Sequence, residues 1–176
     1  VYAMTRELGM NRSSLLEGFG SFSGVKRRQE FKGEKRGVLV VDDFAHHPTP
    51  VAETIKAVKD AFTGRRVWAV FEPRSNTSRR NIFEREFALA LSLADQVVVS
   101  GLHQPEKIPE AERLSVDRVV ESINEFAGHE QAVVIDGSDN IAAHVTARAR
   151  AGDIILVMSN GAFDGVQDKI LSELAS

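Results

Sequence analysis

Two carboxylates and two imidazoles lie close together at residues 42–49, DDFAHHPT. A carboxylate here could hold a ribose or order a metal-bound water, and a histidine could hydrogen-bond a phosphate or a ribose. Alternatively the segment is only a turn before a helix, in which Asp42 and Asp43 accept hydrogen bonds from free backbone N–H groups. The adjacent His46 and His47 lack the spacing of a zinc pair on a helix, so no metal site formed by these residues alone is expected.

Three arginines lie in a second polar segment, residues 72–80, EPRSNTSRR. Guanidinium groups bind phosphate and carboxylate through paired N–H donors, so the segment is a candidate anion site. The alternative is a solvated surface on which Ser78 caps a helix. A third segment, residues 158–165, MSNGAFDG, could offer backbone N–H groups to an anion, although by itself it is typical of a plain turn. The basic segment at residues 24–30 is typical of a solvated linker.

The elements that position these segments follow from hydrophobic periodicity. Short apolar runs predict strands at residues 37–41, 67–71, 96–99, 132–135 and 153–158. Segments with helical spacing follow each run: after Pro48, from Phe83, after Ser115, from Ile141 and from Val166. This alternation predicts an α/β fold: an open, mostly parallel, Rossmann-like sheet of five to six strands with helices on both faces. Ligands bind such sheets beyond the carboxyl ends of the strands, where the polar segments lie.

Composition excludes several classes of protein. The 176 residues carry 22 Lys+Arg and 25 Asp+Glu, a net charge of −3, and 43% are hydrophobic. This balance gives no electrostatic drive toward nucleic acid or a membrane, so neither is an expected partner. No apolar run reaches the roughly 20 residues that span a bilayer, and no signal peptide is evident. The absence of cysteine excludes disulfides and fits a cytoplasmic location. There is also no Walker A loop, Rossmann glycine fingerprint or nucleophile elbow.

The first 36 residues differ from the rest. Residues 1–24 predict two short helices that cannot bury their apolar faces alone, and the second is expected to be broken by glycines at 18, 20 and 24. We therefore expect them to belong with chain upstream, as the initial Val also suggests. Residues 25–36 hold six basic and two acidic side chains and predict a linker or edge strand.

Taken in order, these segments resemble the C-terminal domain of the Mur ligases, which form amide bonds in peptidoglycan precursors at the expense of ATP. DDFAHHPT is similar to the DDYGHHPT signature of the branch that adds L-alanine to UDP-N-acetylmuramate, and VKRR at 25–28 is similar to the family's G-x-x-R-R interdomain junction. The resemblance implies that residues 1–24 end the ATP-binding central domain, 25–36 form a linker or edge strand, and 37–176 form the C-terminal domain.

Two departures from the alanine-adding pattern point to another branch of the family. FEPRSNTSRR at 71–80 stands in place of FQPHRYTR, and SNGAF at 159–163 stands in place of a Gly-Ala-Gly turn. Both resemble the branch that joins recycled murein tripeptide, L-alanyl-γ-D-glutamyl-meso-diaminopimelate, to UDP-N-acetylmuramate. Phe44 replaces the usual tyrosine and lacks its hydroxyl. The DNPR motif for diaminopimelate is absent, so other groups must recognise that residue.

The resemblance implies a two-step reaction. ATP phosphorylates the muramyl carboxylate, and the peptide amine then displaces phosphate. The Mg²⁺ ligands and phosphate loop would lie in other domains, this domain would close as a lid against its own central domain, and the chain alone would be inactive. On the nucleotide side the implied residues are Arg28 (with Arg27 as alternate), Asp43, Phe44 and His46, of which Asp43 and His46 would be catalytic. On the peptide side they are Arg74, Asn76, Thr77, Arg79, Ser159, Asn160 and Phe163.

Three alternatives remain open at this level. One is the alanine-adding ligase, and the loop at 74–78 discriminates it. Another is a non-catalytic nucleotide-binding or regulatory α/β module, which would bind a nucleotide tightly by itself. A flavodoxin-like or receiver-type domain suits the acidic pair at 42–43, but it does not suit the histidines or the arginine loop.

Overall fold

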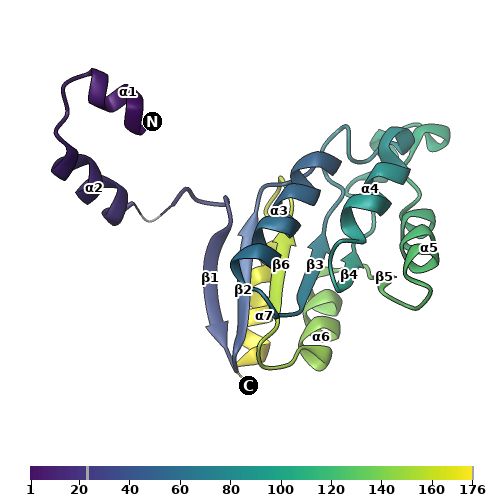
Figure 1. The fold of residues 1–176 in the computed structure, drawn as a ribbon. Coiled ribbons are helices and arrows are strands. Elements are labelled where there is room, and N and C mark those ends of the chain that lie inside the picture. The colour runs from purple at the N-terminus through teal and green to yellow at the C-terminus, as the bar shows by residue number, and fades with distance from the viewer. Residues whose placement is uncertain (23, 176) are drawn as a thin grey trace.

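The computed structural model describes residues 1–22 and 24–175, and its centre is a six-stranded sheet (Figure 1). The strand order is β1-β2-β6-β3-β4-β5. β1 pairs antiparallel with β2, and the other neighbouring pairs are parallel. The strands are β1 (Glu30–Lys35), β2 (Val38–Asp43), β3 (Val67–Phe71), β4 (Gln96–Val99), β5 (Ala132–Val134) and β6 (Ile154–Met158). The predicted open, mostly parallel sheet is confirmed.

Helices cover both faces of this sheet (Figure 1). One core forms between the sheet and the helices α3 (Pro48–Ala61), α4 (Glu84–Leu91) and α5 (Val116–Ala127). A second core forms against α6 (Ser138–Arg148) and α7 (Val166–Leu174). Neighbouring strand residues such as Leu39 and Val40 enter opposite cores. The central strands must therefore be apolar at every position, which explains their unbroken hydrophobic runs.

Local sequence signals set several helix boundaries. Pro48 begins α3, where its fixed φ suits the first helical position and its missing N–H costs nothing. The Ser115 hydroxyl accepts a 3.2 Å hydrogen bond from the Arg118 N–H and caps α5, which begins directly after Ser115 as predicted. Single turns of 3₁₀ helix lie between the longer elements: η1 (Asn81–Phe83), η2 (Pro105–Lys107), η3 (Glu110–Glu112) and η4 (Phe163–Gly165).

The two N-terminal helices, α1 (Tyr2–Glu7) and α2 (Arg12–Ser21), stand apart from the sheet (Figure 1). Gly18 lies inside α2 together with Gly20, so the prediction that these glycines break the helix is wrong. A glycine costs only about 1 kcal/mol in a helix, and the Asn11 side chain caps this one at the Ser14 N–H. Phe22 remains 65% exposed just after α2. Within the described residues, no helix is long and apolar enough to cross a bilayer.

Candidate functional site

The polar segments meet at the carboxyl edge of the sheet. In the parallel register Asp43 is level with Met158, and Met158 is level with Phe71. The segments that follow β2, β6 and β3 are therefore neighbours in space, although Glu72 and Ser159, which begin the segments after β3 and β6, are 87 positions apart in the sequence. The structure thus brings the sequence-predicted residues of 42–49, 72–80 and 159–163 to one edge.

Asp43, at the end of β2, binds the backbone of the segment that precedes β1. It is 5% exposed and occupies the last position of the strand, whereas the sequence predicted a strand ending at residue 41. One carboxylate oxygen accepts from the Gln29 N–H at 2.8 Å, and the other accepts from the Ala45 N–H at 2.7 Å. The carboxylate therefore holds two backbone segments together. The interpretation of this segment as a turn is right in part, because Asp43 does accept hydrogen bonds from backbone N–H groups. The residue that caps α3 is His47, whose side chain makes no capping bond.

Arg27 is committed to partners within the fold. Its Nη2 donates 2.5 Å hydrogen bonds to the carbonyl oxygens of both Ser159 and Gly161. Its Nε lies 3.3 Å from a carboxylate oxygen of Asp42, whose other oxygen accepts from Gln167 of α7 at 2.9 Å. This use of the guanidinium leaves Arg27 poorly placed to bind a ligand.

Arg27 also faces the Phe44 ring, with its guanidinium carbon 5.1 Å from the ring centre. Arg28, unlike Arg27, is exposed, and it lies against the same ring. Its guanidinium carbon is 5.1 Å from the centre of the Phe44 ring, a distance typical of a cation–π contact. The His46 ring packs edge-on against Phe44 at 5.3 Å. The His46 Nδ1 lies 2.8 Å from the Phe44 carbonyl oxygen. Since a carbonyl only accepts, Nδ1 carries the proton, and in the neutral ring Nε2 is left as an acceptor. The part of the carboxyl edge next to β2 thus presents the Arg28 cation, the Phe44 ring and the His46 imidazole.

Glu72 organises the other side and was missed by sequence analysis. It is 6% exposed at the end of β3, and its Oε2 accepts a 2.5 Å hydrogen bond from the Ser159 hydroxyl. Its Oε1 lies 3.5 Å from Nη1 of Arg74. The Ser159 hydroxyl also accepts from the Gly161 N–H at 2.9 Å. The signal that could have found Glu72 is its place directly after a buried strand that faces the ligand edge.

Arg74 occupies the space that a side chain on Gly161 would fill. A Cβ built on Gly161 would lie 2.1 Å from both Cδ and Nε of Arg74. The arginine side chain therefore lies directly against the backbone of the turn after β6.

The other arginine predicted for the peptide side points elsewhere. The Arg79 guanidinium donates to the carbonyl oxygens of His103 and Gln104 at 2.8 and 3.1 Å, so it braces the loop after β4. The interpretation of Ser78 as a helix cap is wrong: this residue is fully buried, and its hydroxyl hydrogen-bonds Ser75. The remaining residues predicted in this loop, Asn76 and Thr77, are exposed.

Two residues of the turn after β6 complete the edge. The side-chain oxygen of Asn160 is buried and has no hydrogen-bond partner within residues 1–22 and 24–175. Phe163 is 3% exposed. It lines a hollow of about 200 Å³ that also reaches Glu72, Ser100 and His103. A buried acceptor without a donor is costly, so the Asn160 oxygen is a natural contact for a ligand N–H.

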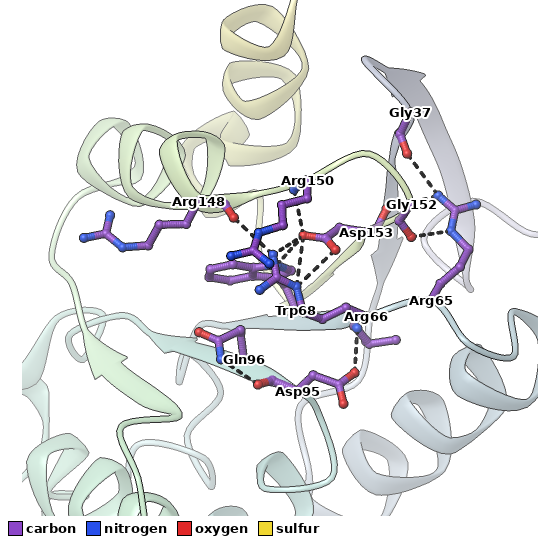
Figure 2. A network of polar contacts seen from close by, with 11 residues as sticks. Gly37, Arg65, Arg66, Trp68, Asp95, Gln96, Arg148, Arg150, Gly152 and Asp153 are labelled. Carbon is purple, nitrogen blue, oxygen red and sulfur yellow. Dashed lines mark hydrogen bonds and ion pairs between the residues drawn. The ribbon is translucent and has the colours of Figure 1, made fainter.

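The opposite, amino edge of the sheet carries a polar network with a different character (Figure 2). Asp153 is 4% exposed and accepts from Arg66 at 2.6 Å, from the Trp68 indole N–H at 3.0 Å and from the Arg150 N–H at 2.9 Å. Burial alone would raise the pKa of Asp153, but these hydrogen bonds lower it below its ordinary value. Because every partner belongs to the fold, we interpret this network as structural.

Metal ligands are not grouped at either edge. In the part of the chain that the structure describes, no three His, Asp or Glu side chains come together in a way that could hold a metal ion.

Comparison with known proteins identifies relatives of this chain. The Mur ligase model, glutamate ligase domain, matches residues 27–161. Over 174 residues the chain is 40% identical to the UDP-N-acetylmuramate–L-alanyl-γ-D-glutamyl-meso-2,6-diaminoheptandioate ligase of Escherichia coli, covering 98% of this chain and 35% of that protein. Over 173 residues it is 39% identical to the UDP-N-acetylmuramate–L-alanine ligase of Mycolicibacterium smegmatis, covering 96% and 34%. The chain thus spans about a third of the length of these relatives.

Solved structures agree. A murein peptide ligase from Psychrobacter arcticus superposes with a TM-score of 0.73 at 31% identity, covering 99% of this chain and 35% of that one. The UDP-N-acetylmuramate–alanine ligase of Thermotoga maritima gives a TM-score of 0.77 at 21% identity, covering 97% and 35%. At that identity the second likeness shows the fold alone.

Proposed function

Since the chain belongs to the Mur ligase family, we propose that it is the C-terminal domain of an ATP-dependent ligase that joins murein tripeptide to UDP-N-acetylmuramate. One observation carries the proposal: side chains suited to bind a nucleotide and side chains suited to bind a peptide lie together at the carboxyl edge of one sheet. Arg28, Phe44 and His46 form the first group, and Arg74 and the turn after β6 form the second.

The N-terminal helices are proposed to end the ATP-binding central domain. Leu8 is 82% exposed and Phe22 is 65% exposed, and these apolar side chains need a partner surface. Residues 25–36 would then join the two domains, and within them β1 already lies on the edge of the sheet. In this arrangement the C-terminal domain closes over the nucleotide like a lid.

On the nucleotide side we assign Arg28 to the phosphates or ribose and Phe44 to packing near the base. His46 would reach the nucleotide or the reacting centre through Nε2, because Nδ1 is occupied by the Phe44 carbonyl. Asp43 would support catalysis by fixing residues 44–46, since both of its oxygens already accept backbone N–H groups. Arg27, the alternate nucleotide ligand, is supported less because its guanidinium is engaged within the fold.

On the peptide side Arg74 would bind a carboxylate of the tripeptide, and the Asn160 oxygen would accept from a peptide N–H. Ser159 and Phe163 would shape the floor, with Asn76 and Thr77 at the rim. Arg79 would contribute through the loop that it braces. The hollow of about 200 Å³ that Glu72 and Phe163 line supports the tripeptide, because L-alanine would fill only part of it.

The reaction that we propose uses ATP to form an acyl phosphate on the muramyl carboxylate, which the incoming amine then attacks with release of phosphate. Arg28, Phe44 and His46 suit the phosphates, ribose and base of a nucleotide. The described residues contain no group of three His, Asp or Glu side chains that could hold a metal ion, so we propose that other domains hold Mg²⁺. What the chain itself supplies is positioning of the two substrates and exclusion of water from the acyl phosphate on closure.

The L-alanine ligase is the second candidate, because the relative of that kind from Mycolicibacterium smegmatis is 39% identical to this chain. The test uses the full-length protein with ATP, Mg²⁺ and UDP-N-acetylmuramate, and follows ADP release with either tripeptide or L-alanine. Release with the tripeptide alone is the expected result. Release with L-alanine alone would move the protein to the other branch and refute our reading of the 72–80 loop.

A further inference from the structure

The backbone around Arg27 is held in an unusual conformation. Arg27 has a φ of +57° and Gln29 a φ of +48°, so two non-glycine residues within three positions are left-handed. Such backbone persists only where its surroundings fix it. Here the Arg27 N–H donates to Glu30 at 2.7 Å, and the Gln29 N–H donates to Asp43 at 2.8 Å. The junction therefore aims the Arg27 side chain in one direction.

That direction is the turn after β6, on the peptide side of the edge. The two carbonyl oxygens that Arg27 holds belong to Ser159 and Gly161. Ser159 is the residue whose hydroxyl is bound to Glu72, and Gly161 is the residue against which Arg74 lies. One guanidinium thus fixes both ends of the turn on which Arg74 rests.

The charge of Arg27 has a local partner as well. Asp42 is 4% exposed, and Arg27 lies 3.3 Å from it. A buried carboxylate needs such a partner, which keeps the guanidinium in place between β2 and the turn.

We infer that Arg27 is a positioning residue for the incoming amine substrate, acting through the 159–161 turn rather than by touching nucleotide or peptide. This inference rests on the proposed function. The inference gives two consecutive arginines different roles. Arg28 contacts the nucleotide, whereas Arg27 supports binding of the amine substrate by holding the 159–161 turn against which Arg74 lies.

The test compares R27K with wild type in the full-length ligase. Lysine keeps a positive charge near Asp42 but lacks the planar fork that reaches both carbonyls and the carboxylate. Loss of a charge-assisted hydrogen bond to the turn should raise the KM for the amine substrate about tenfold. Arg27 also lies 5.1 Å from the centre of the Phe44 ring, but lysine keeps a positive charge there. Because Arg28 is unchanged as well, the KM for ATP should stay within about twofold.

The control is R66K. Arg66 also forks a buried carboxylate, Asp153, and a carbonyl oxygen, that of Arg148, but at the amino edge. We expect R66K to lower Tm, as R27K does, and to leave the KM for ATP and the KM for the amine substrate unchanged. A merely structural role for Arg27 would give the same pattern in R27K, and that result would overturn the inference, as would a rise confined to the KM for ATP.

A second variant keeps the inference testable if R27K fails to fold. R27Q/D42N removes the buried charge pair together, and the glutamine amide can reach only part of the turn. The same selective rise in the KM for the amine is expected, and an unchanged KM would refute the inference. Absence of any ADP release by the wild type with either amine would instead refute the proposed function.

Discussion

The Ser159 hydroxyl donates a 2.5 Å hydrogen bond to the Glu72 carboxylate, across the carboxyl ends of β6 and β3. Both residues are buried, and the bond joins the turn after one strand to the loop after its neighbour. It sets the relative position of the two segments that we assign to the peptide.

S159A should destabilise the chain by about 2 kcal/mol, because it removes a hydrogen bond to a buried carboxylate. Urea unfolding at pH 7 measures this loss. S100A is the matched control: Ser100 is also buried at a strand end, but its hydroxyl bonds the carbonyl of the next residue, so a loss of about 1 kcal/mol is expected. Equal losses would show that the Glu72 bond has no special weight.

G161A should displace Arg74 more than it disturbs the fold. The new Cβ would meet the flexible arginine side chain, which can move away from the turn. We expect the KM for the amine substrate to rise about tenfold in the full-length protein with little change in Tm. G18A, at a helical glycine with open space around it, should leave that KM unchanged. A G161A enzyme with wild-type KM would contradict the placement of Arg74.

D153N should cost about 3 kcal/mol, because it leaves Arg66 without its buried partner (Figure 2). The pKa of Asp153 is lowered in the fold, so the unfolded chain binds this proton more readily. The stabilisation is therefore full above the unfolded pKa of about 3.9 and is lost as pH falls through the folded pKa. The difference between wild type and D153N in urea should shrink from pH 7 to pH 3.

D95N is the control for that experiment. Asp95 accepts from the Val67 N–H and pairs with Lys59, but its side chain is 37% exposed. Its loss should cost about 1 kcal/mol. A D153N effect no larger than that of D95N would contradict a structural role for the amino-edge network.

His144 should make stability fall on mild acidification. Burial beside Trp68, together with the nearby Arg148 charge, lowers the pKa of His144, and Glu130 only partly opposes this. The folded chain therefore resists protonation, and the contribution of the neutral ring is full above the unfolded pKa of about 6.5. It is lost as pH falls through the lowered pKa. The difference between wild type and H144Q in unfolding free energy should be smaller at pH 5 than at pH 8, and a constant difference would contradict this account.

Much of the fold follows from local sequence. The strand predicted at 67–71 matches β3 at both ends, because it is an apolar run bounded by polar residues. The helix predicted from Val166 begins at that residue in α7, just after Gly165. The end of β2 was misplaced because Asp42 and Asp43 are polar residues inside a strand. Their burial is compensated by Arg27 and by backbone N–H groups from an earlier segment, which periodicity does not reveal.

The location of the site at the carboxyl edge of the sheet was predictable from the sequence, but the contacts of its individual side chains were not. Sequence placed three arginines in the loop after β3, yet only the folded loop shows that Arg74 faces the turn while Arg79 braces the β4 loop. Likewise the roles of Arg27 and Arg28 cannot be separated from sequence. Both guanidinium groups face the Phe44 ring, and Arg27 in addition holds the Ser159 carbonyl oxygen and pairs with Asp42.

The central claim is that one sheet edge holds a nucleotide side and a peptide side. R28A and R74A in the full-length protein test it most directly, with KM measured for ATP and for the tripeptide in each variant. We predict that R28A raises the KM for ATP about tenfold and leaves that for the tripeptide near wild type, and that R74A does the reverse. Equal effects on both substrates in the two variants, or no effect in either, would contradict the division of the edge.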